Sequence, residues 1–423
     1  MQLRKMVNKF MDKFFKILYI SEFFSHSAIS GASIVAFNNY YMMRDFGNEC
    51  YFYATNLKPY LEEQSINDFF PESHIFLKDK VSSVKFRLNS LYNSKAKKNL
   101  EKVIEEIKPD VIHIHCPVEL SFSIILAIKK YKIPYIITIH DPGFVCPILG
   151  TGEQKCTLCS KSLLNCVKKK CSRNNYFCSM YVAFKFWINK LLLNTYLPKK
   201  LLFPSKALKD YVESTKYRLN VSHSVFPNTL DKEYENIQPN YSNDRYFLFV
   251  GSLYNAKGID ILLNAIKDLP KDINFHIVGK GTSESENRYK SFADENNLSN
   301  VKFLGQLDRQ EILKEYQKCI ALIVPSNWFE IFGMINIEAF INGKPVIASD
   351  IGGIPEIVEH DKTGLLFEPA NAEQLKYCIL KYWNNNSLVI EHGKNAYKKA
   401  VKLYLGKNTA SILNDFYKEV IIR

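Results

Sequence analysis

Two glutamates, Glu330 and Glu338, are separated by seven residues where a predicted loop leads into a predicted helix. Glu330 follows the apolar run 320–326, and the helix is predicted to begin near Phe332 and Gly333. A helix N-terminus offers free N–H groups and a positive dipole end to an anion, and glycine lets a phosphate approach the backbone. A carboxylate within the helix, at Glu338, accepts hydrogen bonds from neighbouring hydroxyls such as those of a ribose. Phosphate and ribose together predict a nucleotide site, whereas either glutamate alone is typical of a solvated helix surface.

Helix and strand patterns alternate along the chain, in two sets separated by the polar stretch 238–244. Alternation of helices with apolar strands predicts a parallel sheet covered on both faces. The predicted fold class is therefore α/β, with two doubly wound parallel-sheet (Rossmann-like) domains facing across a cleft and ligands at the carboxyl ends of the strands. The predicted strands are residues 16–20, 49–55, 111–115, 135–140 and 200–203, and then 246–252, 274–279, 301–305, 320–326 and 345–349.

Domain boundaries follow from the same alternation. We expect a first domain over residues 1–230, with a cysteine-rich insertion at about 141–178 that breaks the rhythm of strands and helices. The second domain is expected over residues 231–400, and residues 401–423 are expected to form a C-terminal helix that packs back toward the first domain.

Composition is that of a soluble globular protein, with 47% hydrophobic and 23% charged residues in a chain of 423, which excludes a disordered or fibrous class. No apolar run reaches 18 residues, and lysines interrupt the N-terminal segment, so we expect a cytoplasmic protein without a signal peptide. The net charge of +13 resides entirely in residues 1–200, which have 29 basic and 16 acidic residues. This half is predicted to meet something anionic, namely a membrane surface, a phosphorylated acceptor or nucleic acid.

Six of the ten cysteines fall within 33 residues. The Cys156-x2-Cys159 pair has a chelating spacing, and Cys146 together with Cys166 or Cys171 would complete the four sulfurs of a closed structural zinc site. The alternative is a set of reduced thiols that pack a small subdomain.

Residues 325–369 resemble the donor-binding signature of retaining GT-B glycosyltransferases, specifically glycosyltransferase family 4 (glycosyl transferases group 1). The resemblance rests on Glu330 and Glu338, on the segment Gly343–Ala348, and on the Gly352-Gly353 turn before a Glu-Ile-Val sequence. It implies the GT-B architecture and transfer of a sugar from a nucleotide-diphosphate sugar with retention of configuration. It further implies that the second domain binds the donor, that the first binds the acceptor, and that transfer requires no cofactor.

The resemblance also implies roles for individual residues. Glu330 is expected to contact the transferred sugar and His140, which ends strand 135–140, to contact the same sugar from the first domain. Lys257 matches the family's diphosphate clamp, whereas Ser252 replaces an arginine, so Lys280 is expected to assist. The remaining donor contacts are expected from Gly279, the amides of Phe332, Gly333 and Met334, the ribose-binding Glu338, and Gly31 in a loop (residues 30–33) that resembles the family's glycine-rich acceptor-side loop.

His113 and His115 alternate on one strand and therefore share a face; His115 is expected to support the site and His113 to be structural. The predicted acceptor is a glycan or lipid-linked glycan in cell-surface polysaccharide biosynthesis, with an anionic membrane surface as a partner. The alternatives are a zinc-containing nucleic-acid-binding protein, and a sugar synthase or phosphorylase of the same fold. A nucleic-acid partner is not expected, because it leaves residues 325–369 unexplained.

Overall fold

The computed structural model describes residues 14–21, 31–57, 74–78, 91–115, 121, 123–146, 158–216 and 218–422. By their contacts, the residues of the chain form two compact units. Unit 1 comprises Met1–Pro204, Leu208–Thr229 and Thr409–Arg423, and unit 2 comprises Ser205–Ala207 and Leu230–Asn408. The C-terminal residues therefore belong to the same unit as the first half of the chain.

Unit 1 is built on a seven-stranded sheet in the order β3-β2-β1-β4-β5-β6-β7, and each neighbouring pair is parallel. The central strands β4 and β5 are buried along their whole length, as strands covered on both faces must be. The strands are β1 (Lys16–Ser21), β2 (Glu49–Leu57), β3 (His74–Lys78), β4 (Val111–His115), β5 (Tyr135–Thr138), β6 (Lys200–Phe203) and β7 (Ser222–Val225).

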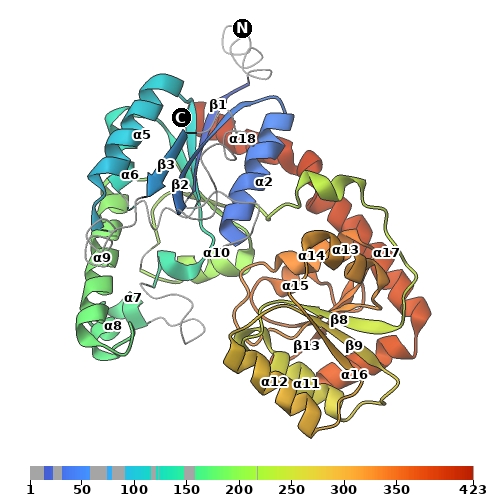
Figure 1. Cartoon of the computed structure of the whole chain (residues 1–423). Helices are drawn as coiled ribbons and strands as arrows, with labels where there is room; N and C mark the ends of the chain where they lie inside the picture. The colour runs from blue at the N-terminus through green and yellow to red at the C-terminus, as the bar shows by residue number, and fades with distance from the viewer. Residues whose placement is uncertain are drawn as a thin grey trace. The chain divides into compact units, whose positions relative to one another are not determined.

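The C-terminal helix α18 (Gly406–Ile422) contributes Ala410, Leu413, Tyr417 and Val420 to the core of unit 1. These residues recur every three or four positions and so lie on one helical face. They pack with residues of β1 and of α2 (Gly31–Asp45) in a single cluster (Figure 1). The other helices are α5 (Ser94–Ile107), α6 (Ser123–Lys130), α7 (Leu158–Lys161), α8 (Leu164–Lys168), α9 (Tyr176–Thr195), α10 (Lys206–Glu213) and the 3-10 turn η1 (Pro142–Phe144).

Unit 2 contains a six-stranded sheet in the order β10-β9-β8-β11-β12-β13, again with parallel pairs. Along β8, Phe247 and Phe249 belong to one core cluster, whereas Leu248 and Val250 belong to another. This alternation shows that the sheet is buried on both faces. The strands are β8 (Tyr246–Val250), β9 (Asn274–Val278), β10 (Val301–Gly305), β11 (Leu322–Val324), β12 (Val346–Ser349) and β13 (Gly364–Phe367).

Helices cover both faces of the unit 2 sheet. Residues of α11 and α16 join the first cluster, and residues of α14 and α17 join the second. The predicted fold of two doubly wound parallel sheets is thus confirmed, and no helix among the described residues is both long enough and apolar enough to span a membrane. The helices are α11 (Ile259–Lys267), α12 (Ser283–Glu295), α13 (Arg309–Lys318), α14 (Met334–Ile341), α15 (Ile354–Ile357), α16 (Ala372–Trp383) and α17 (Asn386–Leu403), with 3-10 turns η2 (Lys232–Asn236) and η3 (Asn255–Lys257).

Candidate functional site

Glycines hold together the loops that follow the central strands of unit 2. Gly258 has a φ of +71°, and a Cβ added to it would lie 1.8 Å from the carbonyl oxygen of Pro325, just after β11. Gly279 has a φ of +145°, and its added Cβ would lie 1.8 Å from the carbonyl oxygen of Gly251, just after β8. Backbone contacts this close exclude every other residue type, so the loops after β8, β9 and β11 form one continuous edge.

Glu330 lies at this edge, in the loop between β11 and α14. Its Oε1 accepts hydrogen bonds from Nζ of Lys257 and from Oγ of Ser326, the latter at 3.1 Å. Its carbonyl oxygen accepts a bond of 2.7 Å from the N–H of Gly353, which follows β12. Within the described residues, its Oε2 accepts no hydrogen bond, although the side chain is only 16% exposed. One carboxylate oxygen is therefore fixed and the other remains available to a hydroxyl donor.

Lys257 and Glu330 were predicted to touch different parts of a donor, and the structure joins them in an ion pair. Lys257 ends η3, immediately before the tightly packed Gly258, so the position of its backbone is fixed by the loop contact with β11. Its side chain remains 38% exposed and can reach an anion while it contacts the glutamate. Ser326 was not predicted from the sequence; its only signal is its place two residues after the buried strand β11.

Helix α14 begins at Met334, after Gly333 with a φ of +94°. Gly333 offers no side chain to cap the first turn, and the N–H groups of Met334 and Ile335 have no acceptor among the described residues, so these two keep their capacity to bind an anion. Phe332 is buried, and its ring makes an edge contact with Tyr404 at 5.9 Å between centroids. Phe332 therefore anchors the start of α14 through its side chain, while its backbone is the predicted phosphate contact.

Glu338, on α14, accepts a hydrogen bond of 3.1 Å from the hydroxyl of Tyr316 on α13. Burial raises the pKa of the Glu338 carboxyl, and the Tyr316 hydrogen bond and the charge of Arg309 oppose that rise. Arg309 itself forms ion pairs with Asp231 and Glu233. Neither Tyr316 nor Arg309 was predicted from the sequence, because only the packing of α13 beside α14 brings them to Glu338.

Ser252 and Lys280 have exposed side chains on the loops after β8 and β9. The two loops are joined by a hydrogen bond of 3.0 Å from the N–H of Leu253 to the carbonyl oxygen of Lys280. Neither Ser252 nor Lys280 forms a side-chain hydrogen bond or ion pair with Glu330 or Lys257 in the described part of the chain. The predicted assistance of Lys280 to the clamp thus remains a prediction.

In unit 1, His140 follows β5 and is paired with His115 at the end of β4. Nε2 of His140 lies 2.8 Å from Nδ1 of His115, and the rings stack with centroids 5.0 Å apart. Burial lowers the pKa of His140 to about 3. Burial and the two neighbouring histidines hold the pKa of His115 well below its usual range, so both rings are neutral at pH 7.

His113 lies on the same face of β4, with its ring 4.2 Å from that of His115. Its Nδ1 is 2.8 Å from the hydroxyl of Tyr417 on α18, and its Nε2 is 2.7 Å from Oγ1 of Thr138 on β5. The Tyr417 hydroxyl also lies 2.8 Å from that of Tyr19 on β1. His113 is therefore a fully bonded part of the core that ties α18 to the sheet.

One further predicted residue of unit 1, Gly31, lies in the described part of the chain, and Asp141 follows the predicted His140. Gly31 is the exposed first residue of α2, and a Cβ added to it would meet nothing within 4 Å. Residue 30 of the expected loop lies outside the described residues, and residues 31–33 form the first turn of α2, so the loop prediction is wrong for the part that the structure describes. Asp141, next to His140, caps η1 by accepting a bond of 2.6 Å from the N–H of Gly143, and burial raises its pKa.

The cysteine cluster is only partly described. Cys159 and Cys166 are buried together with Ala183 in a small cluster between α7, α8 and α9, and Cys146 is half-buried after η1. Cys156 lies outside the described residues, and among those that are described no group of three or more His, Cys, Asp or Glu residues could hold a metal ion. The predicted zinc site, which needs Cys156, therefore stays a prediction.

Comparison with known proteins agrees with this geometry. Residues 231–399 match the family model "Glycosyl transferases group 1", and residues 29–233 match "Glycosyltransferase Family 4". An uncharacterized glycosyltransferase of Methanocaldococcus jannaschii is 33% identical over 302 residues, which are 71% of this chain and 73% of that protein. O-antigen chain mannosyltransferase C of Escherichia coli is 30% identical over 176 residues, which are 41% of this chain and 45% of that protein. The solved structure of Anabaena HepE with UDP and glucose has a TM-score of 0.69 at 17% identity, covering 96% of this chain and 99% of that one.

The two parallel-sheet units, with an acidic pair and a glycine-lined loop edge in the second, define a protein of GT-B architecture. The sequence matches then establish the family. The chain belongs to the glycosyltransferases of group 1 and family 4.

Proposed function

We propose that this glycosyltransferase moves a sugar from a nucleotide-diphosphate sugar to a glycan or lipid-linked glycan, with retention of configuration, in cell-surface polysaccharide assembly. The observation that carries the proposal is the junction of Lys257 and Glu330 at the carboxyl ends of adjacent strands in unit 2. There a cation, a half-free carboxylate and an uncapped helix N-terminus offer complementary groups to a diphosphate and a sugar.

In this proposal, positively charged groups of the chain bind the diphosphate and carboxylates bind the hydroxyl groups of the donor. Lys257 and the N–H groups at the start of α14 stabilise the negative charge that develops on the leaving diphosphate. Oε2 of Glu330 accepts hydrogen bonds from the transferred sugar, and the carboxylate of Glu338 accepts those of the ribose. The chain supplies no assigned general base, and the leaving phosphate is the proposed acceptor of the proton from the attacking hydroxyl.

The names of related proteins support the proposed class of substrate. The Escherichia coli relative is named as an O-antigen chain mannosyltransferase, and the Anabaena neighbour was solved with UDP and glucose. These names favour a nucleotide-sugar donor and a surface glycan acceptor for this chain. The positive charge of residues 1–200, +13 against zero for residues 201–423, favours an approach of unit 1 to an anionic membrane surface.

The test is a panel of UDP-, GDP-, ADP- and dTDP-sugars incubated with the full chain, with released nucleotide as the readout. One class of nucleotide sugar should raise the melting temperature, because a saturating ligand stabilises the state it binds. The same class should be hydrolysed slowly in the absence of an acceptor. Glu330→Gln should lose hydrolysis and keep the melting shift. Absence of both a shift and hydrolysis across the panel would overturn the proposed donor class, and inversion at the anomeric carbon of a transfer product would overturn retention.

A further inference from the structure

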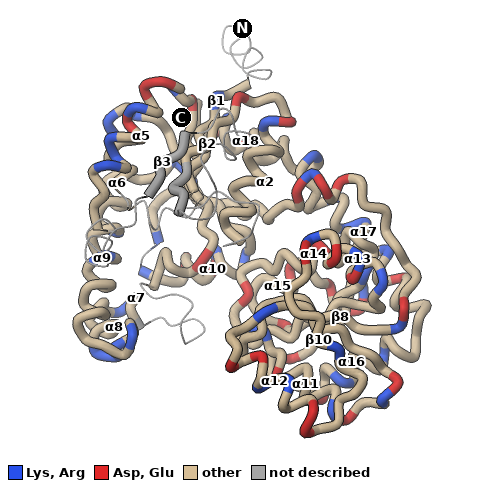
Figure 2. The backbone as a smooth tube through the Cα atoms, viewed as in Figure 1, with Lys and Arg blue, Asp and Glu red and all other residues tan. Residues whose placement is uncertain are grey.

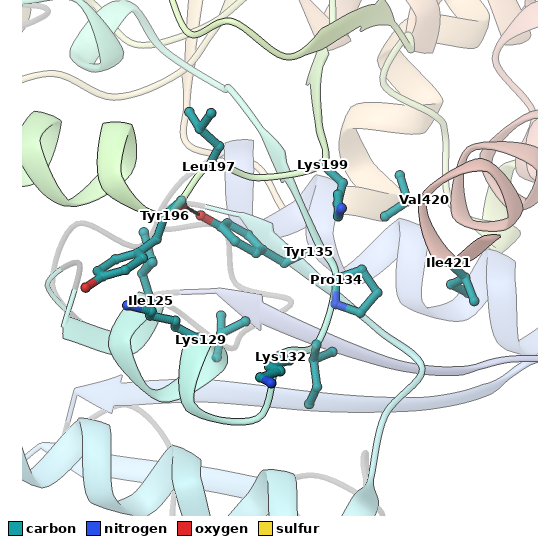
Figure 3. Close-up of a pocket in the computed structure, with 12 residues that line it drawn as sticks. Ile125, Lys129, Lys132, Pro134, Tyr135, Tyr196, Leu197, Lys199, Val420 and Ile421 are labelled. Atoms are coloured by element: carbon teal, nitrogen blue, oxygen red, sulfur yellow. Dashed lines mark hydrogen bonds between the residues drawn. The ribbon is translucent and has the colours of Figure 1, made fainter. Parts of the chain in front are cut away.

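Unit 1 contains a cavity that is separate from the candidate transfer site. Its volume is about 400 Å³, and it lies at the amino ends of β5 and β6, between the C-terminal end of α6 and the last turn of α18 (Figure 3). Tyr135 in its wall begins β5, whereas His140 lies beyond the opposite end of the same strand. At about 3.3 Å per residue, five residues separate the two ends by roughly 16 Å.

The lining of this cavity is amphiphilic and carries one sign of charge. Twelve residues that the structure describes line the cavity: seven are aliphatic or proline, two are tyrosines, three are lysines, and none of the twelve is acidic. Lys129 lies over the ring of Tyr196, with Nζ 3.8 Å from the centroid, and has the ordinary role of a cation at the end of α6. Lys132 and Lys199 have no such role, and neither forms an ion pair with any residue that the structure describes. Three ammonium groups beside an apolar wall are complementary to an anion attached to a hydrocarbon.

Helix α9, which leads into this cavity, carries an exposed apolar stripe. Phe177, Met180, Phe184, Trp187 and Leu191 are each about half exposed or more, from 49% to 77%. They recur at intervals of three and four residues and therefore lie along one side of the helix. Exposed apolar surface of this extent marks an interaction site.

The stripe and the cavity adjoin in the chain, since Tyr196 and Leu197 of the cavity wall follow the last turn of α9. The surrounding segment is uniformly basic, because residues 154–209 contain twelve Lys and Arg residues and no Asp or Glu. Figure 2 shows basic and no acidic positions along α7, α8 and α9. An apolar stripe flanked only by cations is the composition of a helix that lies in the head-group layer of an anionic membrane.

We propose that the α9 stripe inserts into an anionic membrane and that the Lys129–Lys132–Lys199 cavity binds the phosphate head group of one phospholipid. The phosphate accepts hydrogen bonds from the lysine ammonium groups, and the apolar wall contacts the glycerol and the start of the acyl chains. This inference deepens the proposed membrane approach and is independent of the sugar-transfer chemistry, because the cavity and the His140 region lie at opposite ends of β5.

The experiment is co-sedimentation of the full chain with vesicles of phosphatidylcholine, alone or mixed with phosphatidylglycerol. Wild type should bind only the mixed vesicles. Lys132→Gln/Lys199→Gln removes two charges and keeps side-chain length, and it should weaken binding about 25-fold, since each lysine at an anionic surface contributes about fivefold. The matched control is Lys95→Gln/Lys98→Gln on α5 of the same unit, where both lysines are exposed. Binding by this control should stay within a few-fold of wild type.

Trp187→Ser tests the stripe and should weaken binding to mixed vesicles while leaving the melting temperature unchanged, because the side chain is half exposed. Equal loss in the pocket and control variants would overturn the head-group site, and so would wild-type binding to neutral vesicles. Direct binding of glycerol phosphate or inorganic phosphate in the absence of vesicles, lost in Lys132→Gln/Lys199→Gln, would assign the cavity to a free phosphate compound instead. A lipid-free dimer in ultracentrifugation that Trp187→Ser dissociates would assign the stripe to a second copy of the chain.

Donor hydrolysis separates this inference from the proposed function. Lys132→Gln/Lys199→Gln should hydrolyse the nucleotide sugar at the wild-type rate while its vesicle binding falls. If wild type binds mixed vesicles but hydrolyses no donor, the lipid site stands and the proposed function fails. If wild type hydrolyses a donor but ignores lipid charge, the proposed function stands and the lipid site is rejected.

Discussion

Nδ1 of His115 and Nε2 of His140 lie 2.8 Å apart, and this single contact determines which nitrogen of His140 carries its proton. The other nitrogen of His115, Nε2, is buried and has no hydrogen-bond partner in the described structure. An unpaired buried N–H costs more than an unpaired acceptor, so His115 donates from Nδ1 and leaves Nε2 unprotonated. His140 then accepts at Nε2 and, being neutral, carries its proton on Nδ1 as a donor for a ligand.

His115→Ala should therefore lower kcat by about ten- to a hundredfold, with little change in the KM for the donor, because His140 loses its fixed tautomer. Nitrogen-15 NMR should show the Nδ1–H form of His140 in wild type and a mixture in the variant. His113→Gln is the control, since His113 shares the face of β4 but makes no hydrogen bond to His140. An unchanged tautomer in His115→Ala would contradict the proposed positioning role.

Replacement of Glu330 by Gln should abolish transfer and leave nucleotide affinity nearly intact. Its Oε1 is bonded within the chain, and its free Oε2 is proposed to bind the transferred sugar and not the nucleotide. Loss of the ion pair frees Lys257, so the affinity for the nucleoside diphosphate should stay equal or rise slightly. Calorimetry and turnover measure the two effects separately. The matched control Glu373→Gln changes an exposed glutamate at the start of α16. Turnover of Glu330→Gln within tenfold of wild type would remove Glu330 from the reaction.

Glu338→Ala should weaken nucleotide binding by about 1.5–3 kcal/mol, the usual loss for a charged hydrogen bond. The loss should vanish with a nucleotide that lacks the ribose hydroxyls, because its partner is then absent. Tyr316→Phe removes only the hydroxyl that bonds Glu338, so its effect should be smaller. Because burial raises the pKa of Glu338, affinity should begin to fall at a higher pH than for an ordinary glutamate. Equal loss for the ribose and deoxyribose forms would place Glu338 elsewhere.

Acid should destabilise unit 1 through its buried histidines. Burial lowers the pKa of His113 and His140 to about 3, below the unfolded value near 6.5. The unfolded chain therefore binds more protons between these values, and the free energy of unfolding falls as pH decreases below about 6.5. Each such histidine contributes a slope of about 1.4 kcal/mol per pH unit. The free energy of unfolding, obtained from melting curves between pH 7 and pH 5, should fall with decreasing pH more steeply for wild type than for His113→Gln, by up to one proton. Identical dependence of this free energy on pH would contradict a neutral buried His113.

Zinc, if bound by the cysteine cluster, should accompany the purified protein at about one equivalent, as a closed four-sulfur site requires. The double variant Cys156→Ser/Cys159→Ser should release it, whereas Cys378→Ser, in the core of unit 2, should not. Elemental analysis that finds no metal, or the same metal content in the first variant, would favour reduced thiols packed around Ala183.

The sequence alone determined the two parallel sheets and the identity of the acidic pair. Apolar runs such as 111–115 and 246–250 are buried strands because a covered parallel strand must be apolar on both faces. The less apolar β7 (Ser222–Val225) was not predicted; it is a half-buried edge strand whose pattern lacks that signature. The edge strands β3 and β13 were not predicted either, whereas the edge strand β10 was, so every central strand was found but only one of the four edge strands.

Only the tertiary structure decided which side chains meet. Lys257 and Glu330 are 73 residues apart in sequence, and His113 and Tyr417 are 304 apart. These contacts depend on strand order and on the packing of α18 against the sheet of its own unit, neither of which a local pattern encodes. The sequence named the chemical groups, and the fold determined their partners because hydrogen bonds act over about 3 Å between atoms whose positions the whole core sets.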